Sequence, residues 1–502
     1  MKKDVNDKLK YLLKLLTMIF LITSPIFDMT FFHSRITTLI RIFIILVIFI
    51  STIFLYKDSR KSLKYLIIFY LLSASYLIVS YYHSKSFISL FPNNFNYSFI
   101  NELFTILKLI MPITFIYSLY YQKLSKKDFK IIFISWSLFI SLQIIITNMF
   151  KISLSSYSGN IIKYNIFEWN KNIYYIESAS KGYFTYANMT SLTLLMMLIY
   201  NFYFFIKDNF KYIILIFLIS ISMLMLGTRV SSVGGLLTLI CLTICYLFFV
   251  IIKKEKFNKS IFLLLLVIIL WILLLPISPY KNRNIELNKY SNVKKELFDN
   301  NDVYNNDVYN KNDTQTIKKE NSKQEYIESI VNNDLIPEFF YKIYYSYEYD
   351  PDFWIDLIEN TKEKEITYRF LERKIIQRVK NVNNNKLDVL LGISNSRIQN
   401  IHNLERDFIM QYYAFGIIGS IILLSVYLIM LIINIIKLIK KFSFLNSINL
   451  IANILFCFCA YLTGNILCSM TMIIVYSFLS SFMIKEKVMN KVKSVDLQNL
   501  KC

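Results

Sequence analysis

The chain has 502 residues, a formal net charge of +22 and a mean hydropathy of +0.45. Its apolar residues are gathered in blocks of about 20, the length of a helix that crosses a bilayer, and open sheets are excluded there because their edge groups would stay unpaired. Most Lys and Arg lie in short segments that flank these blocks, so the positive charge indicates membrane orientation and excludes nucleic-acid binding.

The block lengths predict an all-α, polytopic transmembrane bundle of about 12 spans. The first block, residues 11–27, follows a basic segment, but no small-x-small cleavage motif comes after it, so a retained first helix is expected. The predicted spans are residues 10–27, 36–56, 63–82, 99–121, 129–149, 183–206, 212–226, 232–252, 261–278, 408–436, 446–464 and 466–484.

Basic clusters predict the orientation of the bundle. The connections after the even-numbered spans carry most of the Lys and Arg found in short loops. Short basic loops stay in the cytoplasm, so both chain termini, including the tail 485–502, are expected there. The protein is therefore predicted to be a multi-pass protein of the cell membrane.

One long hydrophilic segment, residues 279–407, separates the first nine predicted spans (1–278) from the last three (408–484), and alternation places it outside the cell. Its part 281–325 is rich in Asn, Asp and Lys and contains the repeat NNDVYNNDVYN, which predicts a flexible stretch. From Tyr326 to Val382, apolar and aromatic residues return at near-helical spacing. This pattern predicts short helices that pack on one another or on the membrane surface.

Several polar residues are predicted at the outer mouth of the bundle, among them the histidines His33, His83 and His402. Glu102 and Lys108 lie in the outer half of the fourth span, six residues apart, so they do not share a helix face. An ionisable group at membrane depth usually faces a cavity or a partner, which makes Glu102 a candidate site residue. A solvated position just above the hydrocarbon is the alternative.

The sequence KGYFTYAN, residues 181–188, opens the sixth predicted span from the outer side. Gly182 and Asn188 would allow backbone and amide groups to approach a polar ligand, with Lys181 beside them. A glycine at a helix start with interfacial aromatic residues explains the same pattern without a ligand.

The sequence LGTRVSSVGG, residues 226–235, forms a very short outer turn between two spans. Arg229 is flanked there by Thr228 and other hydroxyl and glycine residues, so a guanidinium fork lies among further hydrogen-bond donors. Such a group suits a phosphate or pyrophosphate. The alternative is an interfacial arginine that reaches the lipid headgroups.

The sequence HNLERD, residues 402–407, precedes the tenth predicted span. His402 and Glu405 are about one helical turn apart, so they are suited to act as a base and its orienting partner. Gly416 and Gly419, three residues apart in the apolar helix that follows, predict a close contact with another helix. A solvated helix start is the alternative interpretation of the charges.

Together these motifs resemble the O-antigen ligase and O-antigen polymerase family of membrane proteins, especially Gram-positive members that polymerise capsular or other surface polysaccharides. The resemblance lies in KGYFTYAN, in LGTRVSSVGG, in the large outer loop late in the chain, and in LLGISN followed by ERDFIMQYYAFGIIG.

The resemblance implies roles for individual residues. Arg229 matches the family arginine that holds the lipid pyrophosphate, and a second arginine is expected from the large loop, here Arg369. The family commonly has a His-Asn pair at the position occupied here by Glu405, and the Glu-x-Asp form with Asp407 is similar to the Gram-positive subgroup. Either Glu405 or His402 is then the base. The substrate-binding residues are predicted to be Glu102, Lys181, Gly182, Asn188, Thr228, Arg369 and Asp407.

The resemblance further implies a metal-independent glycosyl transfer without a cofactor. A glycan on undecaprenyl pyrophosphate would pass to a hydroxyl of another lipid-linked repeat unit, and the expected partners are this lipid-linked oligosaccharide, membrane lipid and other polysaccharide assembly proteins. A ligase that moves a finished glycan to a wall polymer or a protein is the alternative. A flippase or other transporter would be expected to show broken helices at the midplane and internal repeats, which the sequence lacks.

Overall fold

The computed structural model describes residues 2–90, 96–170, 175–254, 257–283, 336, 339–360, 368–399 and 406–499. Within these residues, ten helices are long and apolar enough to cross a membrane, and Tyr212–Leu226 and Met470–Ile484 are shorter apolar helices. They coincide with the twelve predicted blocks, which confirms the all-α polytopic fold. The helices are α1 (Lys2–Thr23), α2 (Arg35–Leu55), α3 (Lys57–Ser84), α4 (Phe99–Tyr121), α5 (Lys126–Met149), α7 (Ala187–Lys207), α8 (Tyr212–Leu226), α9 (Gly235–Lys253), α10 (Ile261–Leu274), α17 (Asp407–Lys440), α18 (Phe444–Leu462) and α19 (Met470–Asn499).

Serine caps define where several of these helices begin. The hydroxyl of Ser34 accepts a hydrogen bond from the backbone N–H of Thr37 at 3.1 Å, and the Thr37 hydroxyl accepts one from the N–H of Ser34. Ser125 and Asp128 form the same reciprocal pair at the start of α5. These caps satisfy backbone donors that have no partner within the helix.

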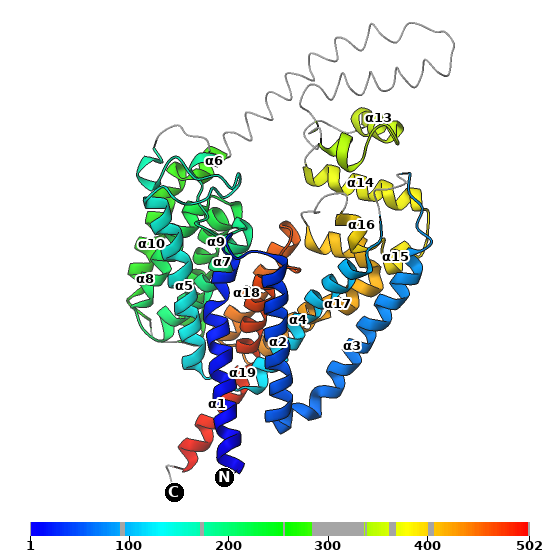
Figure 1. Cartoon of the computed structure of the whole chain (residues 1–502). Coiled ribbons are helices and arrows are strands. Elements are labelled where there is room, and N and C mark those ends of the chain that lie inside the picture. Colours follow the sequence, from blue (N-terminus) through cyan, green and yellow to red (C-terminus); the bar gives the residue numbers. More distant parts are fainter. Residues whose placement is uncertain are drawn as a thin grey trace, which may run out of the picture.

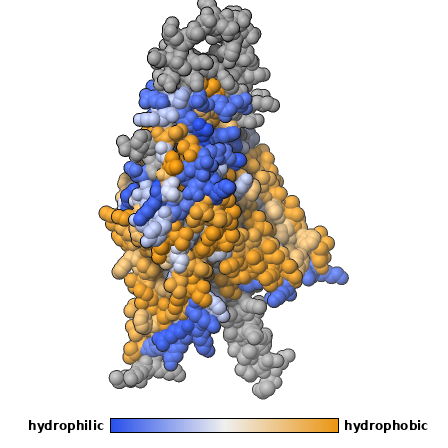
Figure 2. Space-filling model, turned by 90° about the vertical axis from the view of Figure 1, so that its right-hand side faces the viewer, coloured by the Kyte–Doolittle hydropathy of each residue, from blue (hydrophilic) through white to orange (hydrophobic). Residues whose placement is uncertain are grey.

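The helices run between two ends of one bundle (Figure 1). Helix α1 begins and α19 ends at the same end, as an even number of crossings requires, and the opposite end, here the loop end, carries α13 to α16. Figure 2 shows an apolar band with hydrophilic side chains at both of its edges, which is the surface expected of a bundle in a bilayer. Which side of the membrane each end faces remains a prediction.

Helix α7 forms the centre of the bundle and is buried over almost its whole length. It packs against α5, α8, α9 and α18, while α4 packs along α19. Peripheral helices instead expose large apolar side chains, such as Phe43 on α2, Leu71 on α3 and Leu266 on α10. These side chains are positioned to face lipid, where apolar exposure carries no penalty.

Two glycines of α17 allow close approach by other segments, as the sequence predicted. Gly416 has a φ of +63°, and a Cβ on it would lie 2.3 Å from the carbonyl carbon of Leu390 in the short helix α15 (Asp388–Leu391). A Cβ on Gly419 would lie 2.4 Å from the ring of Tyr76 on α3. The Tyr76 hydroxyl donates a hydrogen bond to the carbonyl of Leu391 at 2.8 Å, which ties α3 to the same junction.

The described part of the long hydrophilic segment forms short helices, which are α13 (Pro351–Asn360), α14 (Tyr368–Asn383), α15 and α16 (Asn395–Gln399). Trp354 is fully buried and donates from Nε1 to the carbonyl of Tyr345 at 3.0 Å, and Arg378 on α14 binds Asp350 through two hydrogen bonds of 2.7 and 3.0 Å. The predicted short helices are present, and the Arg378–Asp350 pair joins α14 to the residue directly before α13. Apart from residues 281–283, the stretch predicted to be flexible lies outside the described residues.

Candidate functional site

A cavity of about 460 Å³ lies near the loop end of the bundle. Its walls come from the N-terminal parts of α2, α4, α7, α17 and α19, from α16, and from the segments before α2 and α19. Its polar lining residues are Asp28, His33, Ser34, Arg35, Thr38, Arg41, Asn101, Thr105, Lys108, Tyr186, Asn395, Gln399, Asn465, Ser469 and Thr471. A polar cavity with several positive groups inside an apolar bundle is a binding-site candidate.

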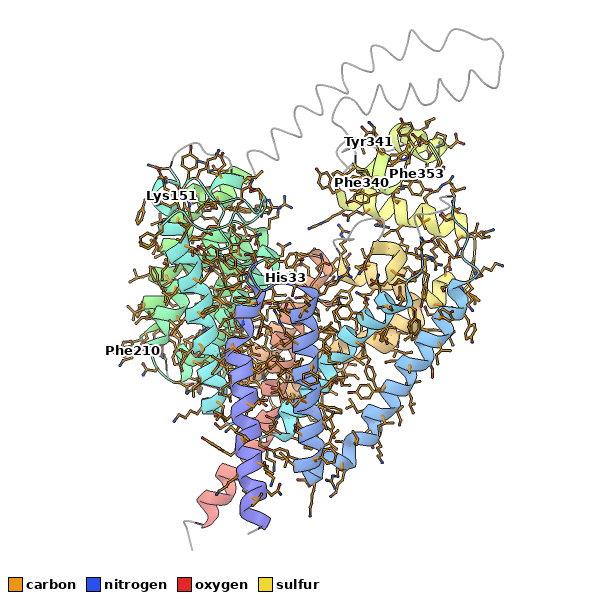
Figure 3. All side chains as sticks on the ribbon, in the orientation of Figure 1. His33, Lys151, Phe210, Phe340, Tyr341 and Phe353 are labelled. Atoms are coloured by element: carbon orange, nitrogen blue, oxygen red, sulfur yellow. The ribbon has the colours of Figure 1, made fainter. Side chains whose placement is uncertain are left out.

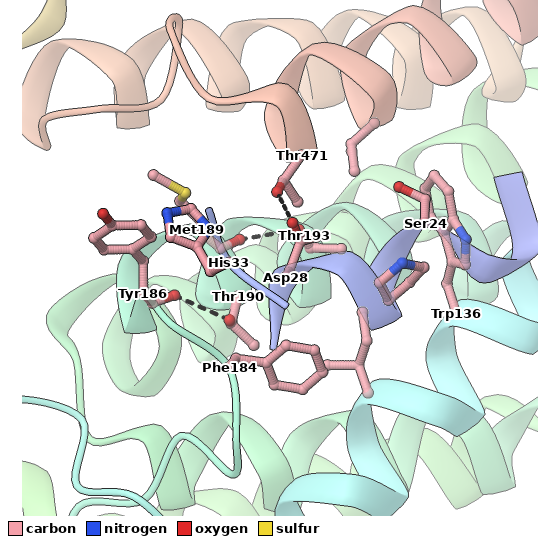
Figure 4. Close-up of a pocket in the computed structure, with 13 residues that line it drawn as sticks. Ser24, Asp28, His33, Trp136, Phe184, Tyr186, Met189, Thr190, Thr193 and Thr471 are labelled. Atoms are coloured by element: carbon pink, nitrogen blue, oxygen red, sulfur yellow. Dashed lines mark hydrogen bonds between the residues drawn. The ribbon is translucent and has the colours of Figure 1, made fainter. Parts of the chain in front are cut away.

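One wall of this cavity is built around a buried ion pair. The guanidinium of Arg41 on α2 lies 2.7 Å from Asp28, the last residue of the short 3₁₀ helix η1 (Ser24–Asp28). Thr471, on α19, donates its hydroxyl to the same carboxylate (Figure 4). Arg41 is only 3% exposed. The ion pair therefore joins the consecutive segments η1 and α2 to α19, which is distant in the sequence.

His33 lies beside this ion pair, in the turn between η1 and α2 (Figure 3). Its ring is 5.2 Å from the ring of Tyr186 in an edge-to-face arrangement. Partial burial lowers the pKa of His33 below its usual value, although the nearby Asp28 carboxylate opposes that change. The imidazole is accordingly neutral at pH 7 and is able to accept a hydrogen bond in the cavity.

The segment KGYFTYAN lies next to the cavity and is held there by hydrogen bonds of its backbone. Lys181 is buried and donates its ammonium to the carbonyl of Thr185 at 2.9 Å, and burial lowers the pKa of Lys181. Gly182 adopts a φ of +64° and donates its N–H to the hydroxyl of Ser153 at 2.8 Å. The N–H of Thr185 donates to the carbonyl of Asp28 at 3.0 Å. Lys181 and Gly182 thus shape the loop that reaches the buried ion pair.

The turn that follows α8 presents Arg229 on the surface. Gly227 ends α8 with a φ of +64°, which a side chain would strain. The Thr228 hydroxyl lies 2.9 Å from the hydroxyl of Ser191 on α7, and the Thr228 N–H donates to Ser231 at 3.1 Å. Arg229 itself is exposed, and within the described residues it has neither an ion pair nor a side-chain hydrogen bond. Its guanidinium is free to bind a ligand, although it is not one of the residues that line the cavity.

Glu102 holds α16 against α4. It is 1% exposed and accepts a hydrogen bond of 2.6 Å from the N–H of Ser396, so the solvated position considered for it is wrong. The adjacent Arg397 stacks on Phe87 with 4.1 Å between guanidinium and ring centre. Burial lowers the pKa of Arg397 to about 10, while Glu102 opposes this. These contacts place Asn395 in the cavity wall.

Asp407 has a similar positioning role at the start of α17. It is fully buried and accepts three hydrogen bonds, from the backbone N–H groups of Asn465, Ile466 and Leu467, at 2.8, 2.6 and 2.8 Å. A carboxylate with three backbone donors fixes that loop in one conformation. Asn465 lines the cavity, so Asp407 shapes its wall without reaching into it.

The remaining predicted residues are less directly connected with the cavity. Glu405 and His402 lie outside the described residues, although Gln399, the last residue described before them, lines the cavity. Arg369 is half-buried on α14. Asn188 is half-buried in the first turn of α7. None of the predicted site residues that the structure describes lines the cavity, whereas direct chain neighbours of two, Glu102 and Asn188, do.

Two of the three cations that line the cavity, Arg35 and Arg41, were not recognised from the sequence. Arg41 is a charged residue inside the apolar block 36–56, and Arg35 directly precedes that block. An ionisable residue at membrane depth is costly unless it is paired or faces a polar space, so Arg41 could have been recognised from the sequence as a candidate site residue. Its partner Asp28 could be identified only from the folded structure, because the two lie on different helical segments.

Comparisons with curated proteins and with solved structures found no match. The model of the O-antigen ligase-like membrane proteins matches residues 8–489, which include the twelve apolar helices, the cavity and the turn with Arg229. The match agrees with the motifs noted above and extends over nearly the whole chain. The chain therefore belongs to the family of O-antigen ligase-like membrane proteins.

Proposed function

We propose that the protein is a polysaccharide polymerase that acts at the outer face of the cell membrane. It transfers a glycan from undecaprenyl pyrophosphate to a hydroxyl of a second lipid-linked repeat unit. The family acts on lipid-linked glycans in the membrane, which supports the substrate class. The observation that carries the proposal is the polar cavity near the loop end, since it offers positive groups next to lipid-facing helices.

The chemistry requires one base and one stabiliser of negative charge. Glu405 or His402 removes the proton of the acceptor hydroxyl, and the acceptor oxygen bonds to the anomeric carbon of the donor. The bond between that carbon and the pyrophosphate oxygen breaks, and undecaprenyl pyrophosphate leaves with the electron pair. Arg229 neutralises the charge that develops on the leaving group. Because pyrophosphate is a stable anion, its departure needs no separate acid.

The geometry around Arg229 supports this assignment. The carbonyl of Met225, just before the turn, accepts a hydrogen bond of 2.8 Å from Ser180, and five residues later Thr185 binds Asp28 at the cavity wall. Ser180 and the KGYFTYAN segment that follows it thus link the Arg229 turn to the cavity, and the donor glycan is proposed to bind beside this segment. Arg369 is proposed as the second arginine on the pyrophosphate.

Deletion of the gene, followed by analysis of lipid-linked glycans, tests the proposal. A polymerase deletion should accumulate single lipid-linked repeat units, because no second unit accepts the glycan. Accumulation of long lipid-linked chains would instead identify a ligase that transfers the finished glycan to a wall polymer or a protein. An unchanged profile would contradict both activities.

A further inference from the structure

The cavity contains an excess of positive charge that the mechanism above does not use. Arg35, Arg41 and Lys108 all line it, and they are called here the cation cluster. Among the described lining residues, Asp28 is the only acidic one, and it is already paired with Arg41. Two positive charges therefore remain without an anion in this part of the structure.

Arg41 also retains an unused donor. Its guanidinium binds Asp28 through Nη1 at 2.7 Å and lies over the ring of Phe27 at 5.4 Å. Its Nε–H is buried and has no hydrogen-bond partner. A buried donor without a partner is unfavourable, so a ligand that accepts a hydrogen bond from it would be stabilised there.

Lys108 is the most unusual member of the cluster. It lies nine residues into α4, about 14 Å along the helix axis from Phe99. Its ammonium lies 5.0 Å from the ring centre of Phe104, and no acidic residue within the described part of the chain forms an ion pair with it. A lysine at this depth is costly unless it faces a polar space or an anion, and here it faces the cavity.

Apolar residues complete the lining next to these charges. Leu39 of α2 is 53% exposed and Ile100 of α4 is 77% exposed, and both contribute to the same cavity. The cavity therefore combines cations with apolar surface that continues onto the outside of the bundle. A ligand that matches both features has an anionic head and a hydrocarbon tail, as a polyprenyl pyrophosphate does.

We propose that the cation cluster binds the pyrophosphate of the acceptor lipid, at a position separate from the donor pyrophosphate on Arg229. The inference rests on the proposed function, because a polymerase uses two lipid-linked substrates, each with its own pyrophosphate. Arg229 is exposed and is not one of the cavity-lining residues, so the proposal assigns the two pyrophosphates to two positions. The cluster thus marks the acceptor as a lipid-linked glycan, which distinguishes a polymerase from a ligase with a lipid-free acceptor.

The test counts the ligands bound by the full-length protein in phosphatidylcholine nanodiscs. Synthetic undecaprenyl pyrophosphate is added, and native mass spectrometry measures how many molecules each variant binds. The double variant Arg35→Gln/Lys108→Gln removes the unpaired charges but keeps Arg41, because loss of Arg41 would leave Asp28 buried without its partner. The variant Arg229→Gln removes the donor position. Lys61→Gln/Lys64→Gln, at the opposite end of α3 from the cavity, is the charge-matched control.

We expect two ligands on the wild type and on the control, and one on each of the other variants, with affinity at the altered position reduced at least about tenfold. Two ligands on the Arg35→Gln/Lys108→Gln variant, or one ligand on the wild type that depends on Arg229 alone, would overturn the inference and leave the proposed function intact. Displacement of the cluster-dependent ligand by equimolar phosphatidylglycerol would also overturn it, since the cluster would then be a headgroup site. No binding to the wild type would contradict the proposed function as well.

Discussion

Arg41 on α2 and Asp28 at the end of η1 form a buried ion pair with a separation of 2.7 Å at the wall of the cavity. The pair connects the first two membrane helices across their short turn, and Thr471 of α19 joins it through its hydroxyl. A charge pair at this depth has a clear cost of desolvation, which is recovered only while both partners are present. The pair therefore couples the shape of the cavity wall to the packing of three helices.

Replacing Asp28 by alanine should destabilise the protein by about 3–5 kcal/mol, because Arg41 would remain buried without its counter-ion. The midpoint of thermal unfolding in detergent measures this. The exposed pair of Lys163 and Glu177 provides the control, and Glu177→Ala should leave the midpoint nearly unchanged. Equal midpoints for Asp28→Ala and the wild type would show that the pair does not stabilise the fold.

Substitution of Gly416 by alanine should disrupt the junction between α17 and α15. The new Cβ would lie 2.3 Å from backbone atoms of Leu390, and the residue would keep a positive φ. Gly159 has a similar φ of +73° but open space around it, so Gly159→Ala tests the effect of a positive φ without a clash. Gly416→Ala should cost at least about twice as much, because the clash is added. Folded yield and thermal midpoint compare the two variants, and similar losses would contradict the close contact.

Arg229→Ala should lower polymer formation about 10²–10³-fold while the protein remains folded in the membrane, because we propose that this exposed side chain stabilises charge on the leaving pyrophosphate. Polymer length on gels and membrane abundance by immunoblot measure the two effects. Lys163→Ala, which removes another exposed cation of a connecting loop, is the control and should behave as wild type. Wild-type polymer from Arg229→Ala would remove this residue from the mechanism.

His33 predicts a loss of stability on acidification. Burial, aided by Arg41 and opposed by Asp28, lowers the pKa of His33 in the folded protein below the value of about 6.5 in the unfolded chain. The unfolded chain therefore binds more protons than the folded protein as the pH falls below about 6.5. The stabilisation that neutral His33 contributes to the folded protein is complete above that pH and is lost as the pH falls through the pKa of His33 in the folded protein. The difference in thermal midpoint between pH 7.5 and pH 5.5 should be smaller for His33→Gln than for the wild type. An equal or larger difference for His33→Gln would contradict the stabilising role of neutral His33.

The sequence was sufficient to predict the membrane helices and one tertiary contact. Ten of the twelve apolar helices are long enough to cross a bilayer, and the other two are shorter, so length together with apolar composition predicted them whatever their neighbours are. The contact at Gly416 and Gly419 was predicted because small residues in an apolar helix have few other uses. Both predictions depend on local properties of the chain.

The geometry of the site could not be predicted from local properties of the chain. Glu102 was recognised as a candidate from its depth, but its partner Ser396 is 294 residues away, so the positioning role appeared only in the folded chain. Asp407 was predicted to bind substrate, whereas its three backbone partners also belong to a distant loop. Long-range polar contacts of this kind leave no periodic pattern in the sequence.

Reconstitution of the purified protein with a synthetic undecaprenyl-pyrophosphate oligosaccharide tests the central claim most directly. Mass spectrometry of the products should show lipid-linked glycans of two, three and more repeat units, with one undecaprenyl pyrophosphate released for each new linkage. A substrate that remains as single repeat units, with the wild-type protein folded and the lipid bound, would contradict the account.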